Sequence, residues 1–499
     1  MKLYLQEDSF AWQPERYHYS VEQMMLSLFP GERPEYPDAA FSSEDNSARF
    51  HLSCDGEDAV MTVQVCRDGR SSTACMPFPA VCLDDTPEKV YHVVQHALKL
   101  TFYQAGVDIL GQEPPWGALT GVRPVKLPTR TMKAGGSYQQ AVEELVQVYR
   151  VSPVRAELAA DCANSSIAAG TLLADNQVSV YIGIPFCPSR CTYCSFISAD
   201  VSRSLKLVEP YLEQVLEEIT RTGEVLRENG MSVRSFYMGG GTPTTLSAQQ
   251  MDRLLTHMKQ HLPLEACLEY TVEAGRPDTI THEKLEVLKK HNIQRISINP
   301  QTLEDHVLAA IGRRHTAEDI HTAYTIAREV GFESVNMDLI AGLPTDSYEG
   351  FSRTLEGVLA LEPENITIHT LAMKKGSRLM ELGGHIPDGS EVARMLELSL
   401  SRLRESGYIP YYLYRQKYMS GSLENVGWAK PGKESLYNIV MMEELQTVLS
   451  IGAGGVTKLV DPDAGKILRL PNPKFAHDYL SSREKVLAQK DEITRFYHP

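Results

Sequence analysis

Residues 178–194 read VSVYIGIPFCPSRCTYC, an apolar run followed at once by three cysteines. The first seven residues are rich in β-branched side chains, which predicts a buried strand over Val178–Ile184. Cys187, Cys191 and Cys194 follow with the spacing Cys-x3-Cys-x2-Cys. Three thiolates on one tight loop can reach three corners of a 4Fe–4S cube, and this loop has no fourth cysteine for the last iron. The stretch therefore predicts an iron–sulfur cluster with one iron open to a ligand.

Two other interpretations of these cysteines are a zinc site and three thiols without a metal. Zinc requires a fourth Cys or His nearby, and the ten residues that follow contain neither. The chain has six further cysteines at irregular spacing: Cys54, Cys66, Cys75, Cys82, Cys162 and Cys267. They match no metal-binding template, so we expect most of them to be small buried hydrophobic residues in the reduced state.

Short β-rich runs alternate with longer amphipathic stretches from Val178 onward. The predicted strands are 178–184, 234–238, 268–272, 294–298, 334–340 and 365–371. The predicted helices lie near 208–229, 247–261, 281–291, 316–330 and 348–361. This alternation implies parallel strands joined by right-handed crossovers. Six strands are fewer than the eight of a closed barrel, so the expected fold class is α/β with an open, partial TIM-like (β/α)6 barrel.

A chain of 499 residues is too long for one core, and roughly 150 residues per domain suggests two to four units. We expect an α+β N-terminal domain over 1–170, a barrel over 175–400 and a mixed C-terminal region over 401–499 that covers the barrel mouth. Local sequence patterns indicate the first domain. These are strands at 48–52 and 59–65, helices at 87–107 and about 138–170, and ordered turns at 114–117 and 120–124.

Polar or glycine residues follow several of the predicted strands. Gly239-Gly240-Gly241-Thr242-Pro243-Thr244 leaves bare backbone that a charged ligand can approach. Glu273 and Gln301 come directly after later strands, and Asp338 interrupts an apolar one, where a carboxylate is costly without a partner. Each feature alone is equally explained by a turn, a cap or a surface residue. Because the carboxyl ends of parallel strands meet at one mouth, together they predict a ligand site there.

The composition argues for a cytoplasmic protein. The chain is 42% hydrophobic and 23% charged, and no run approaches the roughly 20 apolar residues that cross a bilayer. The N-terminus turns acidic at once and has no apolar signal core. A net charge of −15 without a basic cluster argues against nucleic acid as a partner.

These residues together resemble the oxygen-independent coproporphyrinogen III oxidase group of radical S-adenosylmethionine (SAM) proteins. The resemblance covers roughly residues 175–460. It rests on Tyr181-x2-Ile184-Pro185-Phe186-Cys187-x3-Cys191-x-Tyr193-Cys194, Gly239–Thr244, Glu273, Gln301, Arg313 and Asp338-Leu339-Ile340-x-Gly342-Leu343-Pro344. The chain length, the segment Trp116–Lys126 and the variant Tyr181-Ile182-Gly183-Ile184-Pro185 are most similar to the HemZ-type coproporphyrinogen dehydrogenase branch.

The resemblance implies an oxidoreductase of porphyrin and haem biosynthesis. Cys187, Cys191 and Cys194 match the 4Fe–4S ligands of the family. The positions that match its SAM contacts are Tyr181, Tyr193, Gly240, Gly241, Thr242, Glu273, Gln301, Arg313 and Asp338. In the family, a 5′-deoxyadenosyl radical takes hydrogen from a propionate β-carbon, and loss of carbon dioxide and an electron leaves a vinyl group. The implied partners are a tetrapyrrole substrate and a reduced flavodoxin- or ferredoxin-type electron donor, and we expect a monomer.

Two departures from the family pattern bear on the substrate. Gly183 replaces the usual His, and Phe196 replaces a further Cys, the latter a change shared with haem-chaperone relatives. A haem-binding chaperone, or a radical SAM enzyme acting on another tetrapyrrole or an unrelated substrate, therefore remain alternatives. Substrate carboxylates need cations, and the candidates, each also explained as a surface charge, are Lys374, Lys375, Arg378, Arg415, Lys417 and Lys430.

Overall fold

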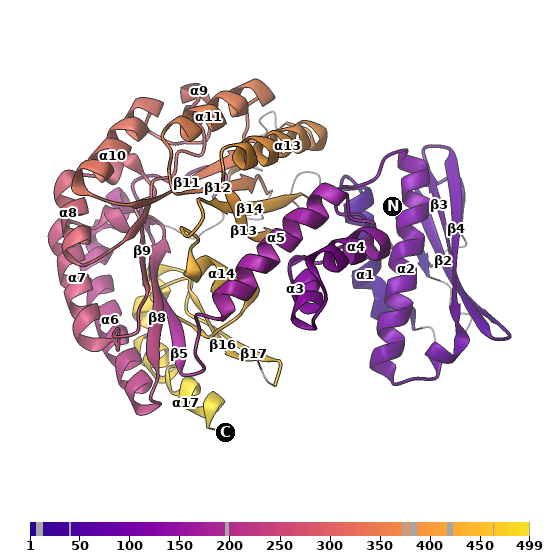
Figure 1. The fold of residues 1–499 in the computed structure, drawn as a ribbon, viewed down its shortest axis with the longest axis horizontal. Coiled ribbons are helices and arrows are strands. Elements are labelled where there is room, and N and C mark those ends of the chain that lie inside the picture. The colour runs from indigo at the N-terminus through magenta and orange to yellow at the C-terminus, as the bar shows by residue number, and fades with distance from the viewer. Residues whose placement is uncertain are drawn as a thin grey trace. The chain divides into compact units, whose positions relative to one another are not determined.

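The computed structural model describes residues 1–5, 13–38, 41–194, 199–372, 377–379, 387–416, 423–462 and 464–498 (Figure 1). The chain forms two units. The first comprises Met1–Ala160 with Arg415–Leu423, and the second comprises Asp161–Tyr414 with Glu424–Pro499. Within the described ranges, no helix is both long and apolar enough to cross a membrane.

A four-stranded sheet with helices on one face forms the first unit. The strand order is β1-β2-β3-β4, with β1 parallel to β2 and the other pairs antiparallel. The strands are β1 (Lys2–Leu5), β2 (Ser47–Asp55), β3 (Asp58–Arg67) and β4 (Arg70–Pro79). Asp68 and Gly69 join β3 to β4 with φ of 50° and 76°, as a two-residue turn between twisted strands requires.

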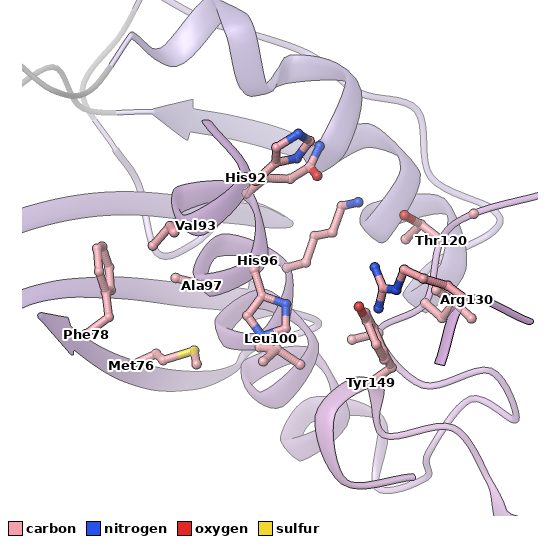
Figure 2. A pocket seen from close by; sticks show the side chains of 15 residues that line it. Met76, Phe78, His92, Val93, His96, Ala97, Leu100, Thr120, Arg130 and Tyr149 are labelled. Atoms are coloured by element: carbon pink, nitrogen blue, oxygen red, sulfur yellow. The ribbon is translucent and has the colours of Figure 1, made fainter. Parts of the chain in front are cut away.

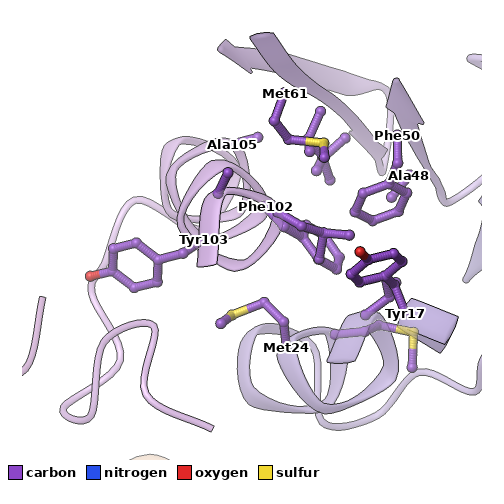
Figure 3. Packing of buried hydrophobic residues seen from close by; sticks show 14 of the residues in the cluster. Tyr17, Met24, Ala48, Phe50, Met61, Phe102, Tyr103 and Ala105 are labelled. Carbon is purple, nitrogen blue, oxygen red and sulfur yellow. The ribbon is translucent and has the colours of Figure 1, made fainter. Parts of the chain in front are cut away.

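The core of this unit lies between the sheet and the helices α1 (His18–Leu28) and α2 (Pro87–Leu110). Alternate residues of β3, including Met61, are buried, as expected for a strand with one face on a core. Figure 3 shows Met61, Phe50 and Phe102 meeting in this core, and the rings of Phe50 and Phe102 pack edge to face with centroids 5.0 Å apart. The predicted strands at 48–52 and 59–65 and the helix at 87–107 are confirmed.

The helical stretch predicted over 138–170 consists of two helices. After α3 (Lys126–Lys133), the chain forms α4 (Tyr138–Tyr149) and then α5 (Pro153–Gly170). Arg150 ends α4 in a left-handed conformation with φ of 58°, and Pro153 has no N–H with which to continue a helix. The helical pattern of the sequence over 138–170 does not show this break.

The prediction that most of the scattered cysteines are buried is wrong. Only Cys66 and Cys162 are buried, whereas Cys54 and Cys75 are exposed and the other two are partly exposed. Cys75 lies opposite Thr62 in the sheet, on the face that points away from buried Met61. A one-residue shift in strand register decides between these two faces.

Six parallel strands form the centre of an eleven-stranded sheet in the second unit, in the order β13-β14-β12-β11-β10-β9-β8-β5-β15-β16-β17. The six are β5 (Gln177–Ile184), β8 (Ser232–Gly240), β9 (Glu269–Glu273), β10 (Arg295–Ser297), β11 (Ser334–Ala341) and β12 (Asn365–Thr370). Each pairs in parallel with its neighbour. All six predicted strands are confirmed, and the sheet stays open, as a partial barrel does.

Helices cover the outer face of this curved sheet (Figure 1). They are α6 (Val201–Glu228), α7 (Ala248–His261), α8 (His282–Lys290), α10 (Ala317–Val330) and α11 (Tyr348–Ala360), with the short α9 (Asp305–Ala310) before α10. The five predicted helices are confirmed, although α6 begins earlier than its pattern indicated. Ser247 begins α7 and Thr316 begins α10 with reciprocal side-chain caps, which fixes where these helices start.

The residues after 400 extend the sheet at both edges. After α13 (Gly389–Glu405), β13 (Ile409–Arg415) and β14 (Glu424–Ala429) continue the sheet beyond β12, and β14 is antiparallel to β12. At the other edge, β15 (Val448–Ile451) is parallel to β5 and is followed by β16 (Val456–Asp461) and β17 (Lys466–Pro471). The remaining helices are α14 (Leu436–Glu443), α15 (Ala476–Ser481), α16 (Arg483–Ala488) and α17 (Asp491–Tyr497).

Candidate functional site

The three cysteines lie on the loop that leaves the carboxyl end of β5. Cys187 ends the two-residue strand β6 (Phe186–Cys187), and the backbone N–H of Cys194 donates to the carbonyl of Cys191 at 3.3 Å. Thr192 attaches the loop to its surroundings, because its N–H donates to Ile311 and its carbonyl accepts from Leu379, both at 3.0 Å. All three thiols are partly exposed. Backbone hydrogen bonds on both sides of Thr192 thus hold the loop, and its three cysteines are only partly covered.

Two donors from neighbouring strand ends point at these sulfur atoms. Thr242 Oγ1 lies 3.6 Å from the sulfur of Cys187, and Arg276 Nη1 lies 3.7 Å from that of Cys191. Arg276 is buried and is oriented by Ser189, whose Oγ lies 3.1 Å from Nη2, and by Asp278. Sequence reasoning missed Arg276. Its position just beyond the end of β9 was the available signal, because that end of the strand faces the site.

The glycine run at the end of β8 packs tightly against this loop. A Cβ at Gly241 would lie 2.5 Å from the carbonyl oxygen of Phe186, and one at Gly239 would lie 2.8 Å from the carboxylate of Glu273. Gly240 has φ of 107°, which L side chains rarely adopt. The N–H groups of Gly241 and Thr242 donate to Ile184 and Phe186 at 2.8 and 2.7 Å. Part of the requirement for glycine is therefore this close approach of two backbone segments.

Glu273, the last residue of β9, projects toward the end of β8. Its Oε1 accepts a 2.5 Å hydrogen bond from Tyr237, and the N–H of Gly240 lies 3.3 Å from Oε2. Burial raises the pKa of Glu273 to about 7, and the charge of Asp338 adds to this, against the hydrogen bond from Tyr237. Tyr237 also stacks on Tyr437 of α14 with ring centroids 4.5 Å apart. This carboxyl group can therefore change protonation state near neutral pH.

Asp338 lies on β11, which β10 separates from the strand of Glu273, and it has a different environment. Asn336 donates to its Oδ1 at 2.8 Å, and His369 Nε2 lies 3.7 Å from Oδ2. Burial favours the neutral form, but these partners outweigh it and leave the pKa of Asp338 below its usual value. The two carboxyls of the site are therefore held with different proton affinities.

Gln301 follows β10 and is joined to β11 by backbone hydrogen bonds. Its N–H donates to the carbonyl of Asp338 at 2.9 Å, and its carbonyl accepts from Ile340 at 3.0 Å. These bonds hold Gln301 in a left-handed conformation with φ of 68°. Arg313, after α9, donates to the carbonyl of Asn299 at 2.5 Å and to the hydroxyl of Tyr193 at 3.2 Å. The structure therefore brings the predicted polar residues to one end of the barrel.

Several buried polar atoms around this end have no hydrogen-bond partner among the described residues. They are Oε1 of Gln301, Oδ1 of Asn299, Nε of Arg313, the hydroxyl of Tyr437 and both ring nitrogens of His315. Buried polar groups are nearly always paired with protein, water or ligand. Such atoms beside buried carboxylates and a thiol loop suit a polar ligand with amino, carboxylate and hydroxyl groups, and three thiols suit an iron–sulfur cluster.

No three His, Cys, Asp or Glu side chains in the described part of the chain are grouped as ligands of a single metal ion. Cluster cysteines bind separate iron atoms, whereas the ligands of one zinc ion surround a common point at about 2.0–2.3 Å.

Gly183 is surrounded by backbone from the turn between β15 and β16. A Cβ at residue 183 would lie 2.9 Å from the carbonyl oxygen of Ala453. The hydroxyl of Tyr211 donates to the carbonyl of Gly183 at 2.7 Å and accepts from the N–H of Ala453 at 2.8 Å. The His that the family carries at this position therefore does not fit unless this turn moves. Phe196, the second departure, lies outside the described residues.

Glu218 of α6 holds this turn in place. It is fully buried and accepts hydrogen bonds from Gly452 at 2.8 Å, Asn472 at 3.0 Å and Tyr479 at 2.5 Å. Lys490 forms a 2.7 Å ion pair with it. The C-terminal helices are thus coupled through one carboxylate to the backbone that packs on β5.

The candidate cations for substrate carboxylates are only partly supported. Arg415 donates to the carbonyl of Leu119 and lies over Trp116, both in its own unit, and its role toward the substrate stays a prediction. Lys430 is misplaced, because it follows the β14 residue that pairs with Asn365, at the amino end of β12. Arg378 lies next to Leu379, which bonds the cysteine loop. Lys374, Lys375 and Lys417 lie outside the described residues.

Comparison with known proteins agrees with this geometry. The Radical SAM superfamily profile matches residues 181–357. The chain is 40% identical over 429 residues to the oxygen-independent coproporphyrinogen-III oxidase-like protein HemZ of Bacillus subtilis, an alignment that covers 83% of this chain and 85% of that protein. It is 32% identical over 281 residues to the heme chaperone HemW of the same organism, covering 55% of this chain and 69% of HemW.

One solved structure supports the fold. Coproporphyrinogen III oxidase (HemN) from Escherichia coli, a radical SAM enzyme, matches with a TM-score of 0.51 at 23% identity, covering 64% of this chain and 72% of that one. The chain therefore belongs to the radical SAM superfamily, in the HemZ-type group of oxygen-independent coproporphyrinogen III oxidase-like proteins.

Proposed function

We propose that this chain is an oxidoreductase that converts two propionate side chains of coproporphyrinogen III to vinyl groups, giving protoporphyrinogen IX without oxygen. The observation that carries the proposal is the meeting of a three-cysteine loop with two differently held carboxylates at one barrel end. The loop contacts Thr242 and Arg276, and the glycine run joins it to Glu273. The 40% identity to HemZ supports the choice of substrate class.

The residues present fit both groups that the superfamily uses. Cys187, Cys191 and Cys194 would hold the 4Fe–4S cluster. The SAM contacts would be Tyr181, Tyr193, Gly240, Gly241, Thr242, Glu273, Gln301, Arg313 and Asp338. When bound, the cluster supplies the electron for reductive cleavage of SAM, which is the radical source of the reaction.

The protein's own groups prepare this site in several ways. Asp338 is held as a carboxylate by Asn336 and His369, so it can bind a cationic or hydroxyl group of a ligand at neutral pH. Tyr237 and Gly240 orient Glu273 in the same space. Thr242 and Arg276 donate toward thiolate sulfurs, which stabilises negative charge on them.

The proposed reaction requires partners. Each decarboxylation loses an electron as well as carbon dioxide, and each SAM cleavage consumes one. We infer a reduced flavodoxin- or ferredoxin-type donor for SAM cleavage, a one-electron acceptor for the electron released by decarboxylation, and a single chain as the working unit. Arg378 precedes Leu379, whose N–H donates to the cysteine loop, and it is the cation that we propose for a substrate propionate.

A haem chaperone is the second candidate. The 32% identity to HemW favours it, as does Phe196, which stands where the oxidases have a further Cys and is a change shared with haem-chaperone relatives. A radical SAM enzyme that acts on another tetrapyrrole would use the same cofactor site.

Anaerobic incubation of the reconstituted, reduced protein with SAM and coproporphyrinogen III separates these functions. The oxidase releases carbon dioxide and forms divinyl product, with 5′-deoxyadenosine in proportion. A chaperone binds haem tightly and transfers it to an apo-haemoprotein but forms no vinyl group. An enzyme of another tetrapyrrole cleaves SAM but leaves coproporphyrinogen III intact.

A further inference from the structure

The first unit contains a cavity of about 650 Å³, within the size range of small-molecule sites. Its walls come from β4, α2, the loop after Trp116, α3 and α4. We call it the α2 pocket, defined by Met76, Val93, His96, Lys99, Thr120 and Tyr149. The proposed oxidase reaction uses none of these residues.

The α2 pocket has an apolar side and a polar side. Figure 2 shows Met76, Phe78 and Val93 on one side of the space and Arg130 and Tyr149 on the other. The opposite face of α2, including Val94, Leu98 and Phe102, is buried in the core of the unit, so the pocket face is fixed in orientation. A ligand with an apolar body and one polar end matches this division.

The charged residues of the pocket lining are both cations. They are Lys99 and Arg130, and no Asp or Glu lines the pocket. Arg130 has a partner, because its Nη2 lies 2.8 Å from Oε1 of Glu144. Lys99, by contrast, makes no hydrogen bond or ion pair with the described residues. Burial lowers the pKa of Lys99, which reports the cost of a half-buried ammonium without a counter-ion.

The polar wall is held firmly. The N–H of Ala118 donates to the carbonyl of Tyr149 at 2.8 Å, and Arg415 donates to the carbonyl of Leu119 at 2.5 Å. A Cβ at Gly117 would collide with the carbonyl of Arg150, so glycine permits this close approach. The loop belongs to the distinctive Trp116–Lys126 segment, to which the proposed reaction gives no role. Its rigidity lowers the entropic cost of binding.

We propose that the α2 pocket binds an organic anion with an apolar ring body, whose negative group pairs with Lys99. The apolar side takes the rings, and Arg130 and Tyr149 flank the anionic group. This inference does not depend on the proposed oxidase function.

The test uses the full chain and anilinonaphthalene sulfonate, an anionic ring compound that fluoresces in apolar sites. We expect the wild type to bind one molecule and Lys99→Met to bind it roughly tenfold more weakly, the loss typical of one charge-assisted hydrogen bond. Lys89→Met is the matched control, because Lys89 lies on the same helix but pairs with Asp85 at 3.0 Å outside the pocket. Its affinity should match that of the wild type. Uncharged N-phenylnaphthylamine should bind Lys99→Met and the wild type equally.

The thermal midpoint of Lys99→Met should equal or exceed that of the wild type, because the substitution removes an unpaired half-buried charge. Arg130→Met, in helix α3, is a second variant that should also weaken binding of the sulfonate. The proposal is overturned if Lys99→Met is folded and binds the sulfonate as the wild type does. It is overturned equally if Lys89→Met loses as much affinity, since binding would then follow overall charge.

Discussion

The hydroxyl of Tyr237 donates a 2.5 Å hydrogen bond to Oε1 of Glu273, between the adjacent parallel strands β8 and β9. This bond favours the carboxylate, yet burial still raises the pKa of Glu273 to about 7. Asp338 contributes in the same direction through its charge. The protonation of Glu273 therefore depends on pH in the physiological range.

We predict that SAM affinity increases from about pH 6 to about pH 8. A cationic group of the ligand binds the carboxylate form of Glu273, and protonation below the pKa of about 7 removes that form. Glu273→Gln should bind more weakly and lose the pH dependence. Tyr237→Phe removes a donor that stabilises the carboxylate, so its profile should shift to higher pH. Calorimetric titration at several pH values measures this.

The stability of the ligand-free protein should show the opposite dependence on pH. The pKa of Glu273 is raised from 4.5 to about 7, so the folded state retains a proton that the unfolded chain releases. Its contribution to stability is full below about pH 4.5 and is lost as the pH rises through about 7.

A wild-type affinity for SAM that is flat from pH 6 to 8 would contradict the assignment of Glu273 to the ligand site.

Replacement of a single loop cysteine should abolish the cluster. Cys191→Ala should lose the brown chromophore and all reductive cleavage of SAM, because a thiolate ligand is removed. Cys267→Ala is the matched control, since burial raises the pKa of that thiol to about 11 and it lies away from the loop. Absorption and EPR spectra after anaerobic reconstitution provide the readout. A complete, SAM-cleaving cluster in Cys191→Ala would show that the ligands are assigned wrongly.

Gly183→Ala should destabilise the protein by about 1–3 kcal/mol, the usual cost of overpacking. The new Cβ would lie 2.9 Å from the carbonyl oxygen of Ala453, and backbone moves less readily than a side chain. Gly170→Ala is the control, because nothing lies within 4 Å of a Cβ there and the helix α5 favours alanine. Denaturant unfolding measures both changes. Equal stability of the two variants would show that the β15–β16 turn shifts to make room for the new Cβ at little cost.

The buried pair of Glu218 and Lys490 offers a test of the C-terminal contacts. Lys490→Met leaves the fully buried carboxylate without a counter-ion and should cost about 3–5 kcal/mol. The double variant Glu218→Gln, Lys490→Met should recover much of this loss, since the uncompensated charge is gone. Arg483→Met, in an exposed pair with Glu217, should have no measurable effect. Full additivity of the two single changes would argue against a direct interaction.

The parallel core could be predicted from the sequence because its strands are apolar runs bounded by amphipathic helices with clear caps. The strand ends then followed from topology, which places Glu273 and Asp338 at one mouth without further information. The spacing of the three cysteines was sufficient to predict the cluster-binding loop. These features are local or follow from one fold rule.

The remainder depends on contacts between distant segments. The pairing of β15 with β5, and the crowding that it imposes on Gly183, leaves no local pattern in either segment. Lys430 is a candidate by its charge, but its position directly after β14 puts it at the amino end of β12. Arg276 was missed because its role depends on Ser189 and Cys191, which are distant in the sequence.

Isotope transfer from the substrate to SAM-derived 5′-deoxyadenosine distinguishes the proposed oxidase from its alternatives. Coproporphyrinogen III deuterated at the β-carbons of its propionates is incubated anaerobically with the reduced protein and SAM, and 5′-deoxyadenosine is analysed by mass spectrometry. We expect one deuterium to enter 5′-deoxyadenosine for each carbon dioxide released and each vinyl group formed. Formation of 5′-deoxyadenosine without deuterium, with the propionates intact, would contradict the proposed oxidase function.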